Sequence, residues 1–382
     1  MTPFTPDPLP QGISRRRWMA AMAATTGSAA LGLPAGAAGA LPTRALVFPR
    51  DHGSHPDLRT EWWYITGHAQ AEGRLWGFQI TFFRSRVDAT QGLQSQLAAK
   101  QLLFAHAALT DVRGQRLMHD QRIARAGFGI AEAAEHDTAV RLRDWHLART
   151  STGAPGGSRY TAQVQGNGFA LQLRFESTQP VLLQGRQGLS RKGPEAAQAS
   201  YYYSQPQLSV HGTLTLEGRR MAIEPPTRAH DNRAWLDHEW SEALMHPEAV
   251  GWDWIGMNLH DGSALTAFHL RRRDGSALWA GGSWRPSGGQ AESFLNPQAV
   301  QFEPLRRWRS ARSGAEYPIA WQVHTPAGRF TVEALLDDQE LDSRGSTGAI
   351  YWEGASVLRN AQGQVVGRGY LEMTGYASRL QL

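Results

Sequence analysis

Hydrophobic and polar residues alternate with a period of two in many short stretches of this chain. Apolar side chains occupy every second position in residues 169–175, 208–216 and 330–336. Because successive side chains of a β-strand point to opposite faces, this alternation is typical of strands with one face in a core. Turn pairs such as Glu72-Gly73 and Asp274-Gly275 separate these stretches. The pattern predicts an all-β protein of short antiparallel strands joined by hairpins.

Two stretches that lie 190 residues apart resemble each other. The shared positions are Trp62, Tyr64, Ile65, Leu75 and Phe78 in the first and Trp252, Trp254, Ile255, Leu265 and Phe268 in the second. Each copy predicts a strand, a turn and a returning strand, which indicates two similar β modules in tandem. Pro225-Pro226 is the best boundary candidate, giving an N-terminal domain of residues 41–226 and a C-terminal domain of 227–382. Residues 194–200 and a few Ala-rich segments could form short helices.

The first 40 residues have the pattern of an export signal. Arg15, Arg16 and Arg17 precede a mildly apolar run over residues 20–33, and Ala38-Gly39-Ala40 has the spacing that signal peptidase prefers. The run is shorter and weaker than the roughly 20 apolar residues of a membrane helix. Paired arginines before such a run indicate twin-arginine export, with an ordinary secretory signal or a membrane anchor as the alternative. We therefore expect a periplasmic protein.

Composition excludes several classes of function. The net charge of +5 is small for 382 residues, and the only lysines are Lys100 and Lys192. A nucleic-acid-binding protein needs a concentrated basic stripe, so we expect no nucleic-acid partner. The absence of cysteine excludes disulfides, a thiol nucleophile and thiolate metal sites. Any chemistry must use carboxylates, imidazoles and aromatic rings, of which the 14 Trp are the most prominent.

Asp237-His238-Glu239-Trp240 is the densest polar and aromatic cluster in the sequence. A zinc-protease motif needs a second His four residues after the first, on a helix, but position 242 is Glu242. On a strand, His238 and Trp240 share one face and Glu239 lies on the other. The cluster is therefore either a catalytic group or a buried His satisfied by a neighbouring carboxylate.

Gly251-Trp252-Asp253-Trp254 is a second cluster, in which Asp253 faces away from both Trp rings. If that face lines a cavity, burial raises the pKa of Asp253 and the carboxyl can act as an acid. If it faces water, Asp253 has no special role, and the sequence leaves both possibilities open. Arginines at the ends of apolar strands, in residues 81–86 and 270–273, fit either a solvated rim or an anionic-headgroup site.

The segment Asp51–His55 could bind a metal through His52 and His55. No third and fourth ligand is evident nearby, and a zinc site needs them, so we assign no metal. A loop that caps one of the β modules is the favoured interpretation.

Several strings resemble one known family when taken together. Residues 61–68 and 77–84 resemble the first half of the AttH-type lipocalin-like family, which includes the carotenoid 1,2-hydratases, and residues 200–204, 235–240 and 251–254 resemble its second half. The resemblance spans nearly all of the chain after residue 40. It implies two tandem lipocalin-like antiparallel β-barrel domains, in agreement with the repeat.

The hydratase branch of that family adds water to the terminal double bond of an acyclic carotenoid without cofactor or metal. Its paired motifs, His-x-Trp and Tyr-x-Asp, correspond here to His238, Trp240 and Asp253, with Gly251 in place of Tyr. The resemblance thus implies Asp253 as the acid that protonates the alkene. Trp faces would stabilise the resulting cation, and His238 would orient or deprotonate water.

Two functions from different classes follow. The leading hypothesis is an exported protein that binds or traffics an apolar ligand, a lipid or isoprenoid. Exported relatives are often encoded beside ABC-type permeases, which makes such a permease a candidate partner. The alternative is a cofactor-independent hydratase, and a purely structural partner with a filled barrel is a third reading. We expect the ligand to contact the aromatic residues Trp62, Tyr64, Tyr202, Trp252 and Trp254.

Overall fold

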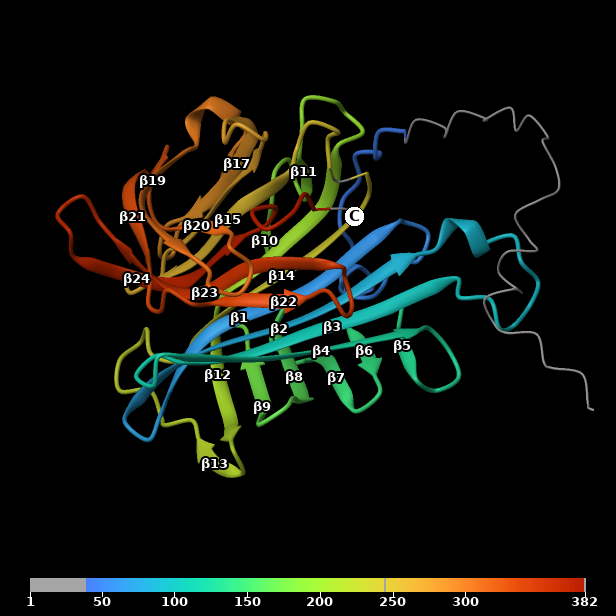
Figure 1. Cartoon of the computed structure of the whole chain (residues 1–382), viewed down its shortest axis with the longest axis horizontal. Helices are drawn as coiled ribbons and strands as arrows, with labels where there is room; N and C mark the ends of the chain where they lie inside the picture. Colours follow the sequence, from blue (N-terminus) through green and yellow to red (C-terminus); the bar gives the residue numbers. More distant parts are fainter. Residues whose placement is uncertain (1–38, 244, 381–382) are drawn as a thin grey trace, which may run out of the picture. The chain divides into compact units, whose positions relative to one another are not determined.

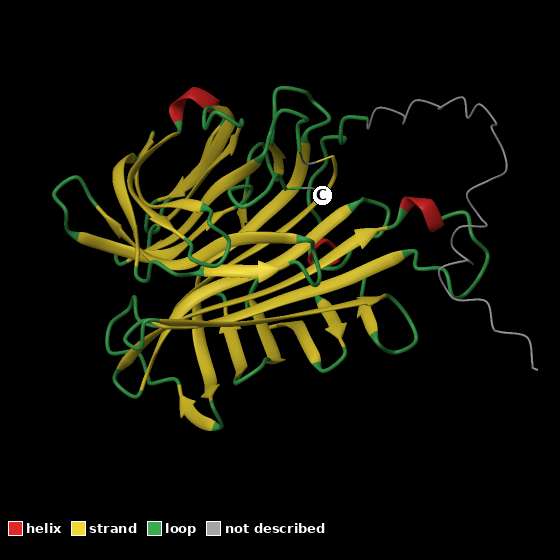
Figure 2. Ribbon diagram, viewed as in Figure 1, coloured by secondary structure: helices red, strands yellow, loops and turns green. Residues whose placement is uncertain are grey.

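The structure is a computed structural model that describes residues 39–243 and 245–380. Within this part of the chain nearly all regular structure is strand, so the all-β prediction is confirmed (Figure 2). The helical turns there are η1 (Arg50–His52), η2 (Asp88–Thr90) and η3 (Pro297–Ala299). Residues 194–198 form bends and turns that lead into a strand instead of a helix.

The predicted export signal lies outside the described residues apart from Gly39 and Ala40. Among the residues that are described, none belongs to a helix long and apolar enough to cross a membrane.

The first sheet has 14 antiparallel strands, in the order β4-β3-β2-β1-β14-β12-β9-β8-β7-β6-β5, and β10, β11 and β13 also pair with β12. Its strands are β1 (Thr60–Ala71), β2 (Arg74–Arg86), β3 (Gln101–Asp111), β4 (Arg116–Arg125), β5 (Ala131–Ala133), β6 (Ala139–Leu142), β7 (Trp145–Ser151), β8 (Ser158–Gln165), β9 (Phe169–Glu176), β10 (Leu182–Leu183), β11 (Leu189–Arg191), β12 (Ala199–Leu216), β13 (Arg219–Ala222) and β14 (Arg233–Ala243).

This sheet curves into a nearly closed barrel. Strands β3 and β4 at one end of the order contact β6 near the other end, and Figure 1 shows β5–β9 facing β1–β4 across the interior. Inward side chains meet there, as Phe78 of β2 and Phe175 of β9 do with ring centroids 5.8 Å apart. The alternation in residues 169–175 and 208–216 therefore marks core-facing positions of β9 and β12.

The second sheet has 10 strands, in the order β18-β17-β16-β15-β24-β23-β21-β20-β19, with β22 paired to β23. They are β15 (Gly251–Leu259), β16 (Ala264–Arg271), β17 (Ala277–Arg285), β18 (Glu292–Phe294), β19 (Gln301–Arg309), β20 (Glu316–Thr325), β21 (Gly328–Ala334), β22 (Glu340–Ser343), β23 (Ala349–Arg359) and β24 (Val365–Met373). This sheet also curves, as a contact between strands near opposite ends of the order shows. His269 of β16 stacks on Phe302 of β19 with ring centroids 4.6 Å apart.

The sequence repeat corresponds to one hairpin in each sheet. The first copy is the β1–β2 hairpin and the second is the β15–β16 hairpin. The limits of the two predicted domains stay a prediction. Strand β14 follows Pro225-Pro226 in the sequence, but it belongs to the first sheet, where it pairs with β1 and β12.

The two sheets pack face to face along β1, β2, β12 and β14 on one side and β15, β23 and β24 on the other (Figure 1). An intersheet core fills part of this seam, including Tyr64, Trp235, Trp254 and Tyr370. Gly77 of β2 permits close approach, since a Cβ there would lie 2.8 Å from the Ala355 Cβ. Both faces of β1 and β14 are consequently buried, one in the first barrel and one in the seam.

Candidate functional site

A cavity of about 300 Å³ lies between the two sheets, outside both barrel interiors. Strands β1, β2, β3, β12 and β14 form one wall, and β15, β16, β23 and β24 form the other. Aromatic side chains dominate its lining: Trp62, Tyr64, Phe83, Phe104, Tyr202, Trp252, Trp254, Phe268 and Tyr351. The five residues that the sequence predicts as ligand contacts are all among them.

Strand alternation explains how these residues come together. On β1, Trp62 and Tyr64 face the cavity while Trp63 between them lies in the first barrel core. On β15, Trp252 and Trp254 face the cavity and Asp253 points away. Because the two hairpins pack against each other through these faces, residues 190 positions apart in sequence line one space.

Burial raises the pKa of three carboxyl groups in the cavity wall toward or above 7. The first belongs to Asp237 of β14, where burial raises the pKa to about 7. It accepts hydrogen bonds from the Tyr202 hydroxyl and the Trp235 Nε1, both at 2.7 Å, and from Ser204 Oγ at 2.5 Å. These bonds favour the carboxylate, but burial outweighs them.

Glu353 and Glu372 are the other two, and they face each other directly across β23 and β24. Burial, and then the charge of Glu372, raise the pKa of Glu353 well above its ordinary value. Burial also raises the pKa of Glu372, to about 8. Two carboxylates at directly opposite strand positions repel each other, so the pair retains at least one proton at neutral pH.

Tyr64 of the first sheet faces this pair. Burial, then the charges of Glu353 and Glu372, raise the pKa of its hydroxyl well above 10. The Tyr64 hydroxyl and Glu353 Oε1 are both shielded from solvent, and they lie close enough to shift each other's pKa although they form no well-aligned hydrogen bond. Tyr64 and Glu353 thus place two weakly paired polar groups in the cavity wall, which a ligand or water could bind.

The cavity wall also contains one lysine. The Lys192 Nζ lies 3.0 Å from Glu239 Oε1 and sits over the rings of Tyr202 and Phe268, at 4.5 and 4.3 Å from their centroids. This pair carries no net charge, so the cavity as a whole is apolar, with neutral acids at its wall.

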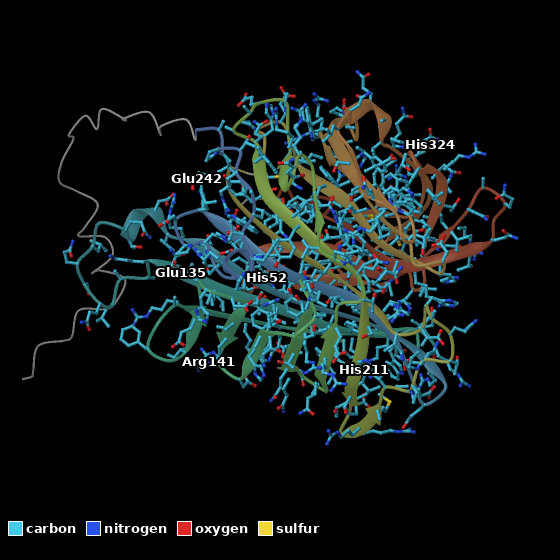
Figure 3. All side chains as sticks on the ribbon, turned by 180° about the vertical axis from the view of Figure 1, so that it is seen from behind. His52, Glu135, Arg141, His211, Glu242 and His324 are labelled. Atoms are coloured by element: carbon cyan, nitrogen blue, oxygen red, sulfur yellow. The ribbon has the colours of Figure 1, made fainter. Side chains whose placement is uncertain are left out.

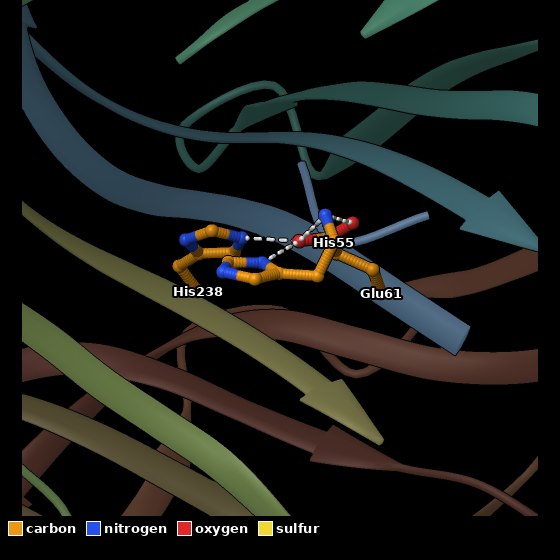
Figure 4. A group of neighbouring side chains, drawn as sticks. All are labelled: His55, Glu61 and His238. Atoms are coloured by element: carbon orange, nitrogen blue, oxygen red, sulfur yellow. Dashed lines mark hydrogen bonds and ion pairs between the residues drawn. The ribbon is translucent and has the colours of Figure 1, made fainter. Parts of the chain in front are cut away.

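His238 and Trp240 point to the other side of β14, into the first barrel. Figure 4 shows the His238 and His55 rings side by side and directed at the same carboxylate oxygen: the His238 Nε2 and the His55 Nδ1 lie 2.9 and 2.7 Å from Glu61 Oε1. The His55 ring stacks on Trp240 at 3.9 Å. The Asp51–His55 loop thus caps the first barrel, as the sequence favours.

This cluster is the one group among the described residues whose ligand-type atoms lie close enough to hold a metal, within 4.8 Å of one another. However, the Arg84 guanidinium binds the Glu61 carboxylate at 2.8 Å, which neutralises the anion that a cation would need. Burial lowers the pKa of His238 to about 4 despite Glu61, so the imidazole is neutral. These three side chains instead satisfy one another, together with Arg84, in a hydrogen-bond network.

The network continues along the inside of the barrel. Tyr203 Oη lies 3.2 Å from the His238 Nδ1 and 2.7 Å from the His52 Nδ1. His52 is almost completely buried, whereas Glu135, which is labelled with it in Figure 3, is exposed. Burial lowers the pKa of His52 to about 2, so this end of the network carries no charge either.

Asp253 lies in the interior of the second barrel. Arg271 Nε is 2.7 Å and the His269 Nε2 is 2.5 Å from its Oδ2, and the Tyr376 hydroxyl donates to Oδ1 at 3.0 Å. Burial alone would raise the pKa of Asp253, but Arg271 and His269 lower it below 3.8, which holds the group as a carboxylate. The structure therefore does not bring His238, Trp240 and Asp253 together, and their catalytic roles stay a prediction.

Two of the arginines expected at strand rims lie elsewhere, whereas Arg272 and Arg273 are partly or fully exposed as expected. Arg84 and Arg271 are buried ion-pair partners of Glu61 and Asp253. Lys192, Glu353 and Glu372 line the cavity although no sequence motif predicted them. A signal for the two glutamates exists, because each stands alone among apolar residues, in Tyr351-Trp352-Glu353 and Tyr370-Leu371-Glu372.

A nearly closed antiparallel barrel, a second curved sheet and a cavity between them define a lipocalin-like fold. Residues 39–376 match the family described as AttH-like. The chain belongs to this family, and the resemblance seen in the sequence is confirmed.

Solved structures agree with this assignment. A protein from Nitrosomonas europaea that carries the AttH name is 45% identical, with a TM-score of 0.79 over 88% of this chain and 99% of that one. Kievitone hydratase from Nectria haematococca is 14% identical, with a TM-score of 0.66 over 87% and 94% of the two chains, and it supports the fold alone. CghA, at 12% identity, has a TM-score of 0.50 over 83% and 88%. No curated protein matches.

We expect Glu372→Gln to stabilise the protein increasingly as pH rises. The folded state holds the Glu372 proton up to about pH 8, against an ordinary pKa of 4.5. The wild type therefore loses stability between pH 4.5 and 8, because unfolding releases that proton. The glutamine has no proton to lose. Thermal unfolding should give a gain on the order of 2 °C or more at pH 8 that shrinks toward pH 5.

Glu217→Gln, at an exposed turn position, is the control and should show no such trend. A difference between Glu372→Gln and the wild type that stays constant with pH would mean that Glu372 ionises as it does in water.

Proposed function

We propose that this protein binds an apolar small molecule of the lipid or isoprenoid class in the intersheet cavity. The observation that carries this proposal is the aromatic lining combined with carboxyl groups whose pKa burial raises to about 7 or 8. Ligand pockets are typically concave, mostly apolar and provided with a few placed polar groups, and about 300 Å³ is the lower end of their range. Neutral acids can donate hydrogen bonds to a ligand oxygen without opposing an apolar ligand by charge.

Filling the cavity should abolish binding. Ala349 lines the cavity at the start of β23, and Ala349→Trp would place an indole in the ligand's space. We expect a short acyclic isoprenoid alcohol to quench the fluorescence of the wild type, because Trp62, Trp252 and Trp254 line the site. The variant should bind at least about tenfold more weakly.

Ala361→Trp, at an exposed position of the β23–β24 turn, provides the matched control. The proposal fails if delipidated wild type binds no isoprenoid or fatty acid, or if Ala349→Trp binds as well as the control. Mass spectrometry of the protein purified from its native host would identify the natural ligand.

A second candidate function, hydration of a carbon–carbon double bond, is favoured by the Glu353–Glu372 pair. A protonated Glu353 can transfer its proton to the less substituted alkene carbon, leaving a carboxylate and a tertiary cation. The Trp252 and Trp254 rings would stabilise that cation through their negative faces. Water then adds to the cation, and the proton that it loses returns to the carboxylate pair, so atoms and charge balance without cofactor.

This candidate keeps the alternative suggested by the sequence but moves the acid from Asp253 to the cavity glutamates. Kievitone hydratase, a structural neighbour, carries hydration in its name, which supports considering the reaction for this fold.

The acid can be identified by product formation in ¹⁸O-labelled water. We expect acyclic isoprenoids to give a labelled tertiary alcohol, and Glu353→Gln to reduce its yield at least about a hundredfold, the scale of a general acid. Asp253→Asn, assayed where it remains folded, should retain activity because Asp253 does not line the cavity. Loss of product in Asp253→Asn but not in Glu353→Gln would return the acid role to Asp253. If the wild type forms no product, the hydration candidate fails and only the proposed ligand binding remains.

We further propose export to the periplasm by the twin-arginine route, with an ABC-type permease as partner. The support is Arg15-Arg16 before a weakly apolar run and the Ala38-Gly39-Ala40 site. We expect Arg15→Lys/Arg16→Lys to remain in the cytoplasm at its unprocessed length, while the wild type is found shortened in the periplasm. Equal distribution of the two would contradict the route. Co-purification with a membrane permease after crosslinking would test the partner.

A further inference from the structure

The seam between the sheets carries a second polar cluster at its other end. Along β1 the seam-facing side chains run from Trp62 and Tyr64 at the cavity to His68, four residues and about 13 Å beyond Tyr64. Trp235 and Tyr370 of the intersheet core fill the space between. The cluster is thus separate from the cavity.

Six cationic or imidazole side chains from both sheets meet at this end. We call them the seam cation cluster: His68, Arg228, His230, Arg233, His260 and Arg368. His68 lies directly opposite Arg233 in the β1–β14 ladder. The His230 and His260 rings, one from each side of the seam, stack at 3.9 Å. Arg368 lies on β24, whose pairing with β15 brings it next to the β15–β16 turn that carries His260.

The cluster has too little negative charge for its cations. Asp231 is the acid that faces it, and its Oδ2 accepts hydrogen bonds from the Thr227 and Arg228 backbone N–H groups and from the Thr227 hydroxyl. Its other contact is a long ion pair of 3.6 Å with Arg228. The carboxylate is therefore already used in holding its own loop.

Several donors in the cluster have no partner. The half-buried Arg368 guanidinium makes no hydrogen bond or ion pair with any described residue, and its Nε is shielded from solvent. The His260 Nε2 is likewise shielded and unpaired within that part of the chain. A cation that is removed from water without a counter-ion is destabilising, so a bound anion would satisfy both atoms at once.

Electrostatics of the cluster are consistent with this. Burial, then the charge of Arg368, lower the pKa of His68 to about 3. Burial, then His230 and Arg368, lower the pKa of His260 to about 4. Burial and the charge of Arg228 lower the pKa of Arg368. Burial and the neighbouring positive charges thus disfavour the cationic forms of His68, His260 and Arg368. A bound oxyanion would favour these cationic forms instead.

We propose that the seam cation cluster binds a phosphate-type oxyanion, either a free ion or the headgroup of a phosphorylated lipid. Arg368 and His260 supply the unpaired donors, Arg233 and Arg228 supply long-range attraction, and the stacked His230 covers one side. Arginine fits tetrahedral oxyanions because its planar fork donates two parallel hydrogen bonds.

The test compares Arg368→Gln with Arg329→Gln, an exposed arginine on β21 in the second sheet. We expect inorganic phosphate and sulfate to raise the Tm of the wild type and of Arg329→Gln beyond the effect of NaCl at equal ionic strength. Arg368→Gln should weaken phosphate binding, measured by calorimetry, by about tenfold or more. Without anion it should melt above the wild type, because one repelled cation is gone.

The source of the oxyanion is resolved by flotation with vesicles of phosphatidylcholine, with and without phosphatidic acid. Binding to phosphatidic acid that free phosphate competes away identifies a headgroup site, and a phosphate response without vesicle binding identifies a free ion. The proposal is overturned if neither ligand acts beyond the NaCl control, or if Arg368→Gln responds as the wild type does.

Discussion

The face-to-face packing of the two sheets determines most of what this molecule can do. It buries the outer faces of β1, β12 and β14, which in an isolated barrel would meet water. Every polar side chain on these strands must then find a partner or lose its charge. Adjacent residues of β14 consequently have different environments: His238 belongs to a hydrogen-bond network inside the barrel, and Asp237 belongs to an apolar cavity in the seam.

Buried acids in this protein differ in charge according to whether a basic side chain reaches them. Glu61 pairs with Arg84 and Asp253 pairs with Arg271, and both acids are carboxylates. No arginine contacts Glu353 or Glu372, so burial and mutual repulsion favour the protonated form of this pair. The same rule applies with opposite sign at the far end of the seam, where arginines and histidines gather without a free carboxylate. The seam between the sheets thus has too few cations for its acids at the cavity and too few anions for its arginines at the seam cation cluster.

The sequence predicted the strands, the repeated hairpin and the face of Asp253 because these depend on local alternation. It also selected five of the nine aromatic residues that line the cavity, since aromatic residues at repeated strand positions are a strong signal. It could not identify which face of β14 meets the cavity, because both faces are buried and alternation cannot distinguish two interiors. Arg84 and Arg271 were expected at rims for a related reason: an interior carboxylate partner from another strand is invisible in the local pattern.

The hydrogen-bond network of His55, Glu61 and His238 also sets the order in which the first barrel can be completed. Glu61 and His238 are 177 residues apart, and β1 has β14 as its second neighbour. During synthesis one edge of β1 therefore stays open until almost two thirds of the chain has emerged, and only then can His55, Glu61 and His238 meet. Such distant pairings make folding slow and leave an unpaired strand edge exposed to other chains. A chaperone that shields this edge would act on the nascent first barrel, before the second sheet exists to cover it.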